Sequence, residues 1–172
     1  MSTVFRPIMR LLAWLYERTN GRFGGRVQGL PVLLLMTTGR KSGRLRKTPL
    51  GYIVRDGSYV VTATNAGSDR HPGWYHNLRV DPHVRLQIQD RQTDAQAVVA
   101  EPELREQLWR ALVQLAPGYR AYEKRTAREI PMVLLTPETP VNRPAIGQPF
   151  SGGQTRSRRL ARGSSQATGL AD

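Results

Sequence analysis

Residues 32–54 read VLLLMTTGRKSGRLRKTPLGYIV, two apolar runs separated by a basic, glycine-containing segment. The runs Val32–Met36 and Leu50–Val54 have the length and composition of buried strands. The segment between them, called here the basic turn (residues 40–47), holds Arg40, Lys41, Arg44, Arg46 and Lys47. These charges repel one another unless an anion lies between them, so we predict a hairpin tip that binds phosphate or carboxylate groups. The other interpretation is a solvated loop whose charges serve only solubility.

Further strands are expected after this hairpin, and they run antiparallel. Asp56-Gly57 is typical of a two-residue turn, here between residues 50–55 and 58–63. A second hairpin joins residues 84–89 to 93–99 around Asp90-Arg91, with apolar and polar side chains alternating along its first strand. A last strand is expected over residues 131–136. Because strands outnumber helices and no βαβ unit repeats, we predict an α+β fold, a small and mainly antiparallel barrel with flanking helices.

Three helices are expected beside these strands. One covers residues 73–80 and ends at Asp81-Pro82, and a longer one runs from Pro102 to about Ala116, with proline in its first turn. A third over residues 117–126 would place Tyr119 and Tyr122 on one face.

Composition limits the chemistry that the chain can perform alone. Its 172 residues predict one domain and contain no cysteine, which excludes disulfides, thiolate metal sites and cysteine nucleophiles. The histidines, His71, His76 and His83, do not have the spacing of a zinc-binding helix, so we expect no metal site. An enzyme with so few reactive groups takes its chemistry from a cofactor.

The net charge of +13 is concentrated in the first part of the chain. Residues 1–50 contain ten Lys or Arg and one acidic residue, Glu17. A basic surface suits nucleic acid, an anionic membrane or an anionic cofactor. No aromatic residue lies between Arg40 and Lys47, and no helix-turn-helix, zinc-finger or RNP pattern is present, so we expect no nucleic-acid partner.

The two ends of the chain are expected to differ from its middle. Residues 1–25 contain an amphipathic helix over residues 4–18, too short and too charged to cross a membrane. Two interpretations stay open: the helix packs on its own barrel, or it lies on an anionic membrane surface, which Trp14 and Tyr16 would suit. Residues 138–172 are rich in Pro, Gly, Ser and Arg, so we expect a disordered basic tail. The folded domain then spans residues 26–137.

A combination of motifs adds to this picture. Over residues 32–137 the chain resembles the deazaflavin (coenzyme F-420)-dependent nitroreductase and quinone reductase family, through Thr37-Thr38-Gly39-Arg40-Lys41-Ser42-Gly43, Arg46, Pro49, Trp74-Tyr75-His76-Asn77-Leu78, Asp81-Pro82, Tyr119, Tyr122 and Ile130-Pro131. The resemblance implies a split β-barrel of the FMN-binding type, and hydride transfer from the reduced deazaflavin to quinones, nitro compounds or other activated acceptors.

The resemblance also implies roles for individual residues. Those expected to bind the cofactor are Arg40, Lys41, Ser42, Gly43, Arg46, Thr48, Pro49, Ala63, Thr64, Asn65, Trp74 and Asn77. Thr48 and Asn65 depart from the family's usual Asn and Lys. Trp74, Tyr119 and Tyr122 are expected to line the acceptor site, with Tyr119 as the group that orients the acceptor or supplies a proton.

We therefore expect a cytoplasmic oxidoreductase that passes hydride from reduced coenzyme F-420 to an acceptor such as a quinone, and that lies peripherally on the inner face of the cell membrane if its N-terminal helix is interfacial. The oligomeric state stays open. One alternative is an oxidoreductase of the same fold that uses FMN. The other is a non-catalytic module that binds a cofactor or a membrane surface.

Overall fold

A computed structural model of the protein describes residues 5–21 and 25–138, with the side chains described from Leu11 onward. The chain order in this part is helix α1 (Phe5–Arg18), then strands β1 (Arg26–Val27), β2 (Leu30–Thr38), β3 (Leu45–Arg55) and β4 (Ser58–Thr62). A 3₁₀ turn η1 (Asn65–Gly67), helix α2 (Gly73–Leu78) and strands β5 (His83–Ile88) and β6 (Arg91–Val99) follow. The last elements are α3 (Pro102–Leu115), η2 (Pro117–Tyr119), α4 (Arg120–Glu123) and β7 (Met132–Pro137).

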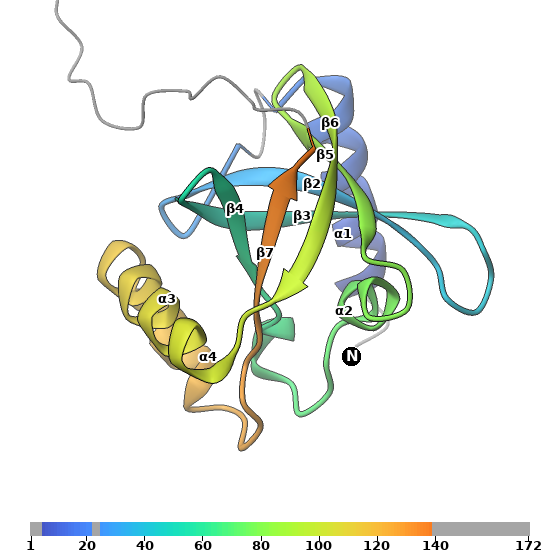
Figure 1. Cartoon of the computed structure of the whole chain (residues 1–172). Helices are drawn as coiled ribbons and strands as arrows, with labels where there is room; N and C mark the ends of the chain where they lie inside the picture. Colours follow the sequence, from blue (N-terminus) through green and yellow to red (C-terminus); the bar gives the residue numbers. More distant parts are fainter. Residues whose placement is uncertain (1–4, 22–24, 139–172) are drawn as a thin grey trace, which may run out of the picture. The chain divides into compact units, whose positions relative to one another are not determined.

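Six of the strands close into an antiparallel barrel in the order β2-β3-β4-β7-β6-β5, because β5 also pairs with β2. The closing pairs include Leu35 opposite Leu86. Figure 1 shows the helices outside this barrel, with α3 beside β4 and β7 and with α1 and α2 on the opposite side. The prediction of a split β-barrel with flanking helices is therefore confirmed.

The apolar run in β2 is continuous because both of its faces are covered. Leu33 and Leu35 belong to the barrel interior, together with residues such as Val133 and Leu86. Their neighbours Val32, Leu34 and Met36 form a second buried cluster with Ala13 and Tyr16 of α1. A strand that alternates between two buried layers needs apolar residues at every position.

Helix α3 covers the outer face of the barrel at β4 and β7. Its buried side chains, Leu108, Trp109, Leu112 and Val113, cluster with Val60, Met132 and Ile53 of the sheet and with Tyr119. This packing places the segment after α3, and Tyr119 with it, next to β3.

Helix α1 packs on the barrel through Ala13 and Tyr16, although Tyr16 was expected to suit a membrane surface. Tyr16 is buried, donates its hydroxyl hydrogen to the Val32 carbonyl at 2.7 Å and accepts from the Gln89 amide at 3.1 Å. Leu11, Leu12 and Trp14, in contrast, are exposed. The helix therefore packs on its own barrel and still presents apolar side chains to solvent. Among the described helices, none is long and apolar enough to span a bilayer.

Several element boundaries differ from the sequence predictions. Strand β3 begins at Leu45, so Arg46 and Lys47 lie on a strand and the turn itself covers residues 39–44. The second hairpin turns at Gln89-Asp90, one residue before the predicted Asp90-Arg91, with Gln89 at φ 57°. Residues 117–126 form a 3₁₀ turn and one α-helical turn instead of a single helix. The predicted tail, apart from Glu138, falls outside the described residues.

Candidate functional site

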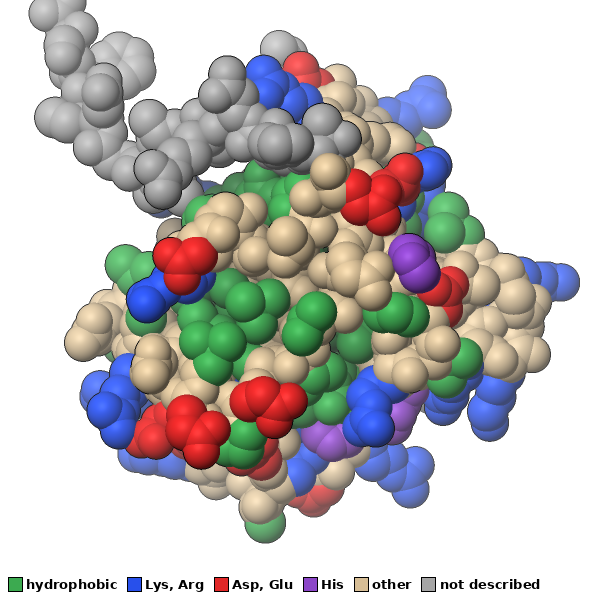
Figure 2. Space-filling view, in the orientation of Figure 1, with side chains coloured by type: hydrophobic (Ala, Val, Ile, Leu, Met, Phe, Trp, Pro, Cys, Tyr) green, Lys and Arg blue, Asp and Glu red, His purple; other side chains and the backbone are tan. Residues whose placement is uncertain are grey.

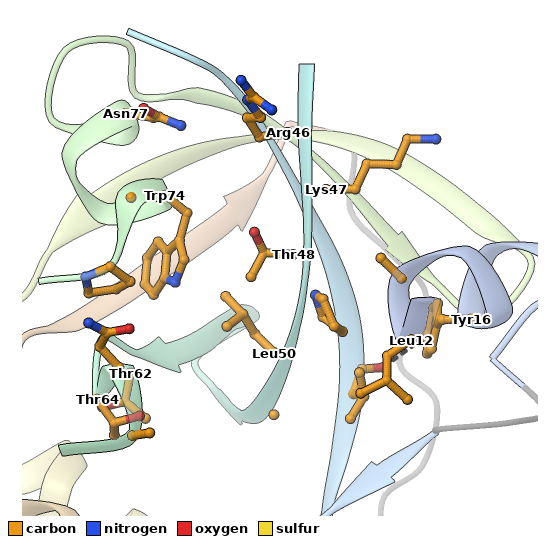
Figure 3. A pocket seen from close by; sticks show the side chains of 18 of the residues that line it. Leu12, Tyr16, Arg46, Lys47, Thr48, Leu50, Thr62, Thr64, Trp74 and Asn77 are labelled. Carbon is orange, nitrogen blue, oxygen red and sulfur yellow. Dashed lines mark hydrogen bonds between the residues drawn. The ribbon is translucent and has the colours of Figure 1, made fainter. Parts of the chain in front are cut away.

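A cavity of about 1050 Å³ lies against β3, between α1 on one side and α2 with the end of β4 on the other. Figure 3 shows Thr48 and Leu50 of β3 in the middle of the view with Arg46 above them, Trp74 and Asn77 across from Leu12 and Tyr16 of α1, and Thr62 and Thr64 near the end of β4. The cavity is thus lined by segments that lie far apart in the sequence, from α1 to Tyr119 and Tyr122.

The structure brings most of the residues named from the sequence around this one cavity. Its lining includes Arg40, Lys41, Ser42, Arg46, Thr48, Pro49, Thr64, Asn65, Trp74, Asn77, Tyr119 and Tyr122. Two residues named with them do not line it. Gly43 lies in the turn with φ 63°, where it allows the chain to reverse, and Ala63 is fully buried in the barrel core.

The basic turn lies at one end of the cavity and owes its shape to local contacts. Gly39 accepts from the amides of Ser42 and Gly43 and donates to the Arg44 carbonyl, at 2.8–3.0 Å. A Cβ on Gly39 would lie 2.9 Å from Ser42 Oγ and 3.0 Å from the Arg44 carbonyl oxygen, so the turn requires glycine there. Arg40, Lys41 and Arg46 are exposed, and Figure 2 shows blue side chains at the projecting end of the β2–β3 hairpin.

Asn77 holds the basic turn against α2. Its side chain is buried, accepts from the Arg40 amide at 3.2 Å and donates to Thr37 Oγ1 at 3.0 Å. Because both ends of the amide are engaged by the protein, Asn77 fixes where the turn begins. Lys47, on the other side of the turn, forms an ion pair with Glu17 of α1.

The opposite end of the cavity is formed by backbone and buried side chains. Three successive residues, Asn65, Ala66 and Gly67, have positive φ values of 47°, 56° and 79°. A Cβ on Gly67 would lie 2.7 Å from Arg125 Cβ, so only glycine fits there. Non-glycine residues with such φ values are strained, and strain of this kind is often found at functional sites.

Thr62 is a lining residue that the sequence analysis missed. Its hydroxyl is buried and has no hydrogen-bond partner among the described residues. A buried hydroxyl without a partner carries a free-energy cost that a bound ligand can remove. Thr62 is the last residue of β4, within the strand that was predicted over residues 58–63.

Two tyrosines close the wall next to β3. The rings of Tyr119 and Tyr122 pack edge to face with centroids 5.5 Å apart. Burial, with a smaller effect of Tyr122, raises the pKa of Tyr119 to about 12, so its hydroxyl is protonated at neutral pH. Gln28 Nε2 donates to the Tyr122 hydroxyl at 2.6 Å, whereas the Tyr119 hydroxyl has no hydrogen bond to the described residues.

Trp74 belongs to both the cavity wall and the core. Its ring is buried, packs edge to face on Tyr75 at 6.2 Å and also lines the cavity. Trp74 is therefore both a residue of the cavity wall and a packed residue of the core.

The cavity opens on the α1 side through apolar residues. Leu12, Trp14, Val27 and Leu45 line it there, and all four are exposed. The cavity is therefore cationic at one end and apolar at its mouth, and the aromatic side chains of Trp74 and Tyr119 also line it. This donor set fits a cofactor with an aromatic ring and an anionic tail.

Comparisons with known proteins agree with this geometry. The family model described as "F420H(2)-dependent quinone reductase" matches residues 8–137. An F420H(2)-dependent quinone reductase of Mycobacterium tuberculosis is 40% identical over 134 residues, which cover 75% of this chain and 89% of that protein. A second protein of that organism, named as a putative member of the same class, is 34% identical over 108 residues, 63% of this chain and 91% of its own length.

Two solved structures are similar as well. A structure described as an F420-H2 dependent reductase matches with a TM-score of 0.56 and 37% identity, over 61% of this chain and 93% of that one. A structure described as a domain-swapped dimer matches with a TM-score of 0.57 and 34% identity, over 77% of this chain and 96% of that one. These matches favour the deazaflavin over the FMN alternative. The chain belongs to the F420H(2)-dependent quinone reductase family and is an oxidoreductase that uses reduced coenzyme F-420.

Proposed function

We propose that this protein transfers hydride from reduced coenzyme F-420 to a quinone, with the cofactor's anionic tail at the basic turn and its ring between Trp74 and Tyr119. The observation that carries the proposal is the cavity itself, which joins exposed cations at one end to buried aromatic and hydroxyl groups at the other. Coenzyme F-420 supplies the hydride, so the protein's contribution is to bind, orient and exclude water.

The cationic end suits the tail. Arg40 and Arg46 offer bidentate forks and Lys41 offers a compact charge, and all three line the cavity. Charge-assisted hydrogen bonds of this kind contribute about 1.5–3 kcal/mol each. Ser42 Oγ lies 3.5 Å from Arg46 Nη2, which keeps that guanidinium at the turn.

The Tyr119 hydroxyl is the candidate for orienting and protonating the acceptor. We propose that the Tyr119 hydroxyl orients an acceptor oxygen or donates a proton to it, because this hydroxyl is protonated at neutral pH and is not engaged by the described protein groups. The ring of Tyr122 packs against it at 85°, and Gln28 fixes the Tyr122 hydroxyl, so the pair is held in one orientation.

The chemistry is tested by a single turnover under anaerobic conditions. Protein loaded with reduced coenzyme F-420 is mixed with menadione, and cofactor oxidation is followed by its absorbance. Oxidation much faster than with free cofactor is expected. A rate equal to that of free cofactor, with the cofactor demonstrably bound, would contradict a quinone as acceptor.

We also propose that the protein lies peripherally on an anionic membrane surface, with the apolar mouth of the cavity toward the lipid. Four exposed apolar residues, Leu12, Trp14, Val27 and Leu45, surround this mouth, and Arg18 lies 5.6 Å from the Trp14 ring centroid. Aromatic and basic side chains together are typical of interfacial helices. A quinone dissolved in lipid would then reach the cavity directly.

Vesicle binding tests this location. The Trp14→Glu variant should lose most of its co-sedimentation with anionic vesicles, because it replaces a membrane-seeking ring by a repelled charge. The matched control is Val98→Glu, at an equally exposed apolar residue of β6 that is not part of the cavity. If both variants co-sediment with the vesicles as wild type does, the mouth of the cavity does not contact the membrane and the proposed location is wrong.

A further inference from the structure

Arg128 does not line the cavity, yet most of its guanidinium contacts go to residues 63–71, the segment that forms the cavity's far wall. Its Nη2 donates to the carbonyl oxygens of Ala63 at 3.0 Å and Thr64 at 2.9 Å, and its Nε donates to that of Ser68 at 2.8 Å. Its Nη1 lies 3.1 Å from His71 Nδ1 and donates to the Glu129 carbonyl at 3.3 Å. A guanidinium has five N–H groups, and these contacts engage all five.

His71 is suited to accept one of these hydrogens. Burial lowers the pKa of His71, and the positive charge of Arg128 lowers it further, so the ring is neutral at pH 7. A neutral ring with its hydrogen on Nε2 presents Nδ1 as an acceptor. Arg128 therefore ties together the start and the end of residues 63–71.

The carbonyls that Arg128 holds determine where the neighbouring amides point. In a trans peptide the C=O and the following N–H point in opposite directions. The Thr64 and Asn65 N–H groups therefore point away from the guanidinium, and neither has a hydrogen-bond partner within the described ranges 5–21 and 25–138. Thr64 and Asn65 both line the cavity.

The backbone conformation at these residues is that of an anion-binding nest. Thr64 has φ −63° and ψ −37°, in the right-handed region, and Asn65 follows at φ 47°, in the left-handed region. This succession turns consecutive N–H groups toward one point, where they bind an anionic or strongly polar oxygen. A cation bound to the carbonyl of a peptide also polarises the N–H of that peptide.

We infer that Arg128 is a positioning residue that aims the Thr64 and Asn65 N–H groups at a carbonyl oxygen of the deazaflavin ring. The inference rests on the proposed function, because it assigns one wall of that same cavity to the ring and not to the tail. Arg128 and Lys41 then have different roles. Lys41 binds the anionic tail, and Arg128 orients the backbone N–H groups that bind the ring.

Two probes separate these parts: complete oxidised coenzyme F-420, and a tail-free ribityl deazaflavin that has the same ring and no phosphate. Their affinities are measured by fluorescence titration with Arg128→Lys and Lys41→Ala. A lysine cannot hold five separated acceptors as a guanidinium fork does. Arg128→Lys should therefore weaken both probes by the same factor, about tenfold, while Lys41→Ala should weaken only the complete cofactor.

The matched control is Arg105→Lys. Arg105 also donates to a backbone carbonyl, that of Ile130 at 3.1 Å, and stacks over the Trp109 ring, but it does not line the cavity. This variant should lower the Tm as Arg128→Lys does and leave the affinity for the tail-free ring unchanged. A loss of ring affinity in Arg105→Lys equal to that in Arg128→Lys would reduce Arg128 to a general stabiliser of the fold.

Amide hydrogen exchange on wild type gives a second measurement that needs no variant. Binding of the tail-free ring should slow exchange at Thr64 and Asn65, and unchanged exchange at both amides would overturn the inference. Unaltered ring affinity in Arg128→Lys would overturn it too and leave the proposed function intact. If wild type binds neither probe, the proposed function itself is wrong.

Discussion

The two ends of the cavity are built in opposite ways. At the basic turn, exposed side chains from one short stretch of sequence, Arg40 to Arg46, reach the cavity from a turn closed by its own hydrogen bonds. At the far wall, the backbone carbonyls of Ala63 and Thr64 are held by Arg128, more than sixty residues later in the chain. The first end is a local property of the sequence, and the second exists only once the barrel has folded.

This difference predicts different responses to mutation. Exposed cations can be removed with little effect on folding, so their loss should appear in ligand affinity alone. Changes at the far wall disturb buried hydrogen bonds and a strained backbone, so affinity and stability should fall together.

The largest effect is expected at the basic turn. The double variant Lys41→Ala/Arg46→Ala should weaken coenzyme F-420 binding by about a hundredfold or more, because each lost charge-assisted bond is worth about 1.5–3 kcal/mol. Fluorescence titration measures the affinity, and thermal unfolding should show little change. Arg44→Ala is the matched control, since Arg44 is equally exposed and does not line the cavity. An Arg44→Ala loss as large as that of the double variant would mean that only the net charge matters.

A smaller effect, on rate and not on affinity, is expected at Tyr119. Tyr119→Phe should slow menadione reduction by roughly a hundredfold, the lower end of what one proton donor contributes, while cofactor affinity stays nearly constant. Tyr122→Phe should do less, because the Tyr122 hydroxyl is already engaged by Gln28. Single-turnover oxidation of bound reduced cofactor measures both variants. An unchanged rate in Tyr119→Phe would leave solvent as the proton source.

At the far wall, Gly67→Ala should affect stability and affinity together. The new methyl group would lie 2.7 Å from Arg125 Cβ, in a residue with φ 79°. A cost of about 1–3 kcal/mol is expected from the strained backbone, with a parallel loss of cofactor affinity. Gly57→Ala is a control with a similar φ of 81° and open space around it. Equal affinity of the two variants would mean that the left-handed segment is not part of the binding site.

The smallest effect is expected from pH. Because burial raises the pKa of Tyr119 to about 12, its proton stays in place, and Tyr119 ionisation should leave the pH–rate profile flat between about pH 6 and 9. The sign for stability follows from linkage: the folded state holds this proton more tightly than the unfolded state, so stability is fully present below pH 10 and is lost as the pH rises toward 12. A profile with a tyrosine-dependent step near pH 8, absent in Tyr119→Phe, would contradict this.

The same contrast explains what the sequence could and could not predict. The basic turn, the hairpin at Asp56-Gly57 and the paired tyrosines depend on nearby residues, and all three are visible as short patterns. The deazaflavin cofactor and the split barrel were predicted from motifs whose combination is specific to the family, and the comparisons confirmed both.

What could not be predicted depends on contacts between distant segments. Arg128 donates to backbone carbonyls, which every residue carries, so no sequence pattern marks it. Tyr16 fixes which side of α1 packs on the barrel. Its hydrogen-bond partners, Val32 in β2 and Gln89 in the β5–β6 turn, are far from it in the sequence. Gln28, which donates to the Tyr122 hydroxyl, directly follows the short strand β1, and this strand was not predicted.

The central claim is that one cavity binds an anionic tail at the basic turn and a deazaflavin ring at the far wall. The most direct measurement is a fluorescence titration of the purified protein with coenzyme F-420 and, separately, with FMN. We predict micromolar or tighter binding of coenzyme F-420, at least about a hundredfold weaker binding of FMN, and weaker F-420 binding as salt screens the cations. Binding of FMN as tight as that of coenzyme F-420 would contradict the account.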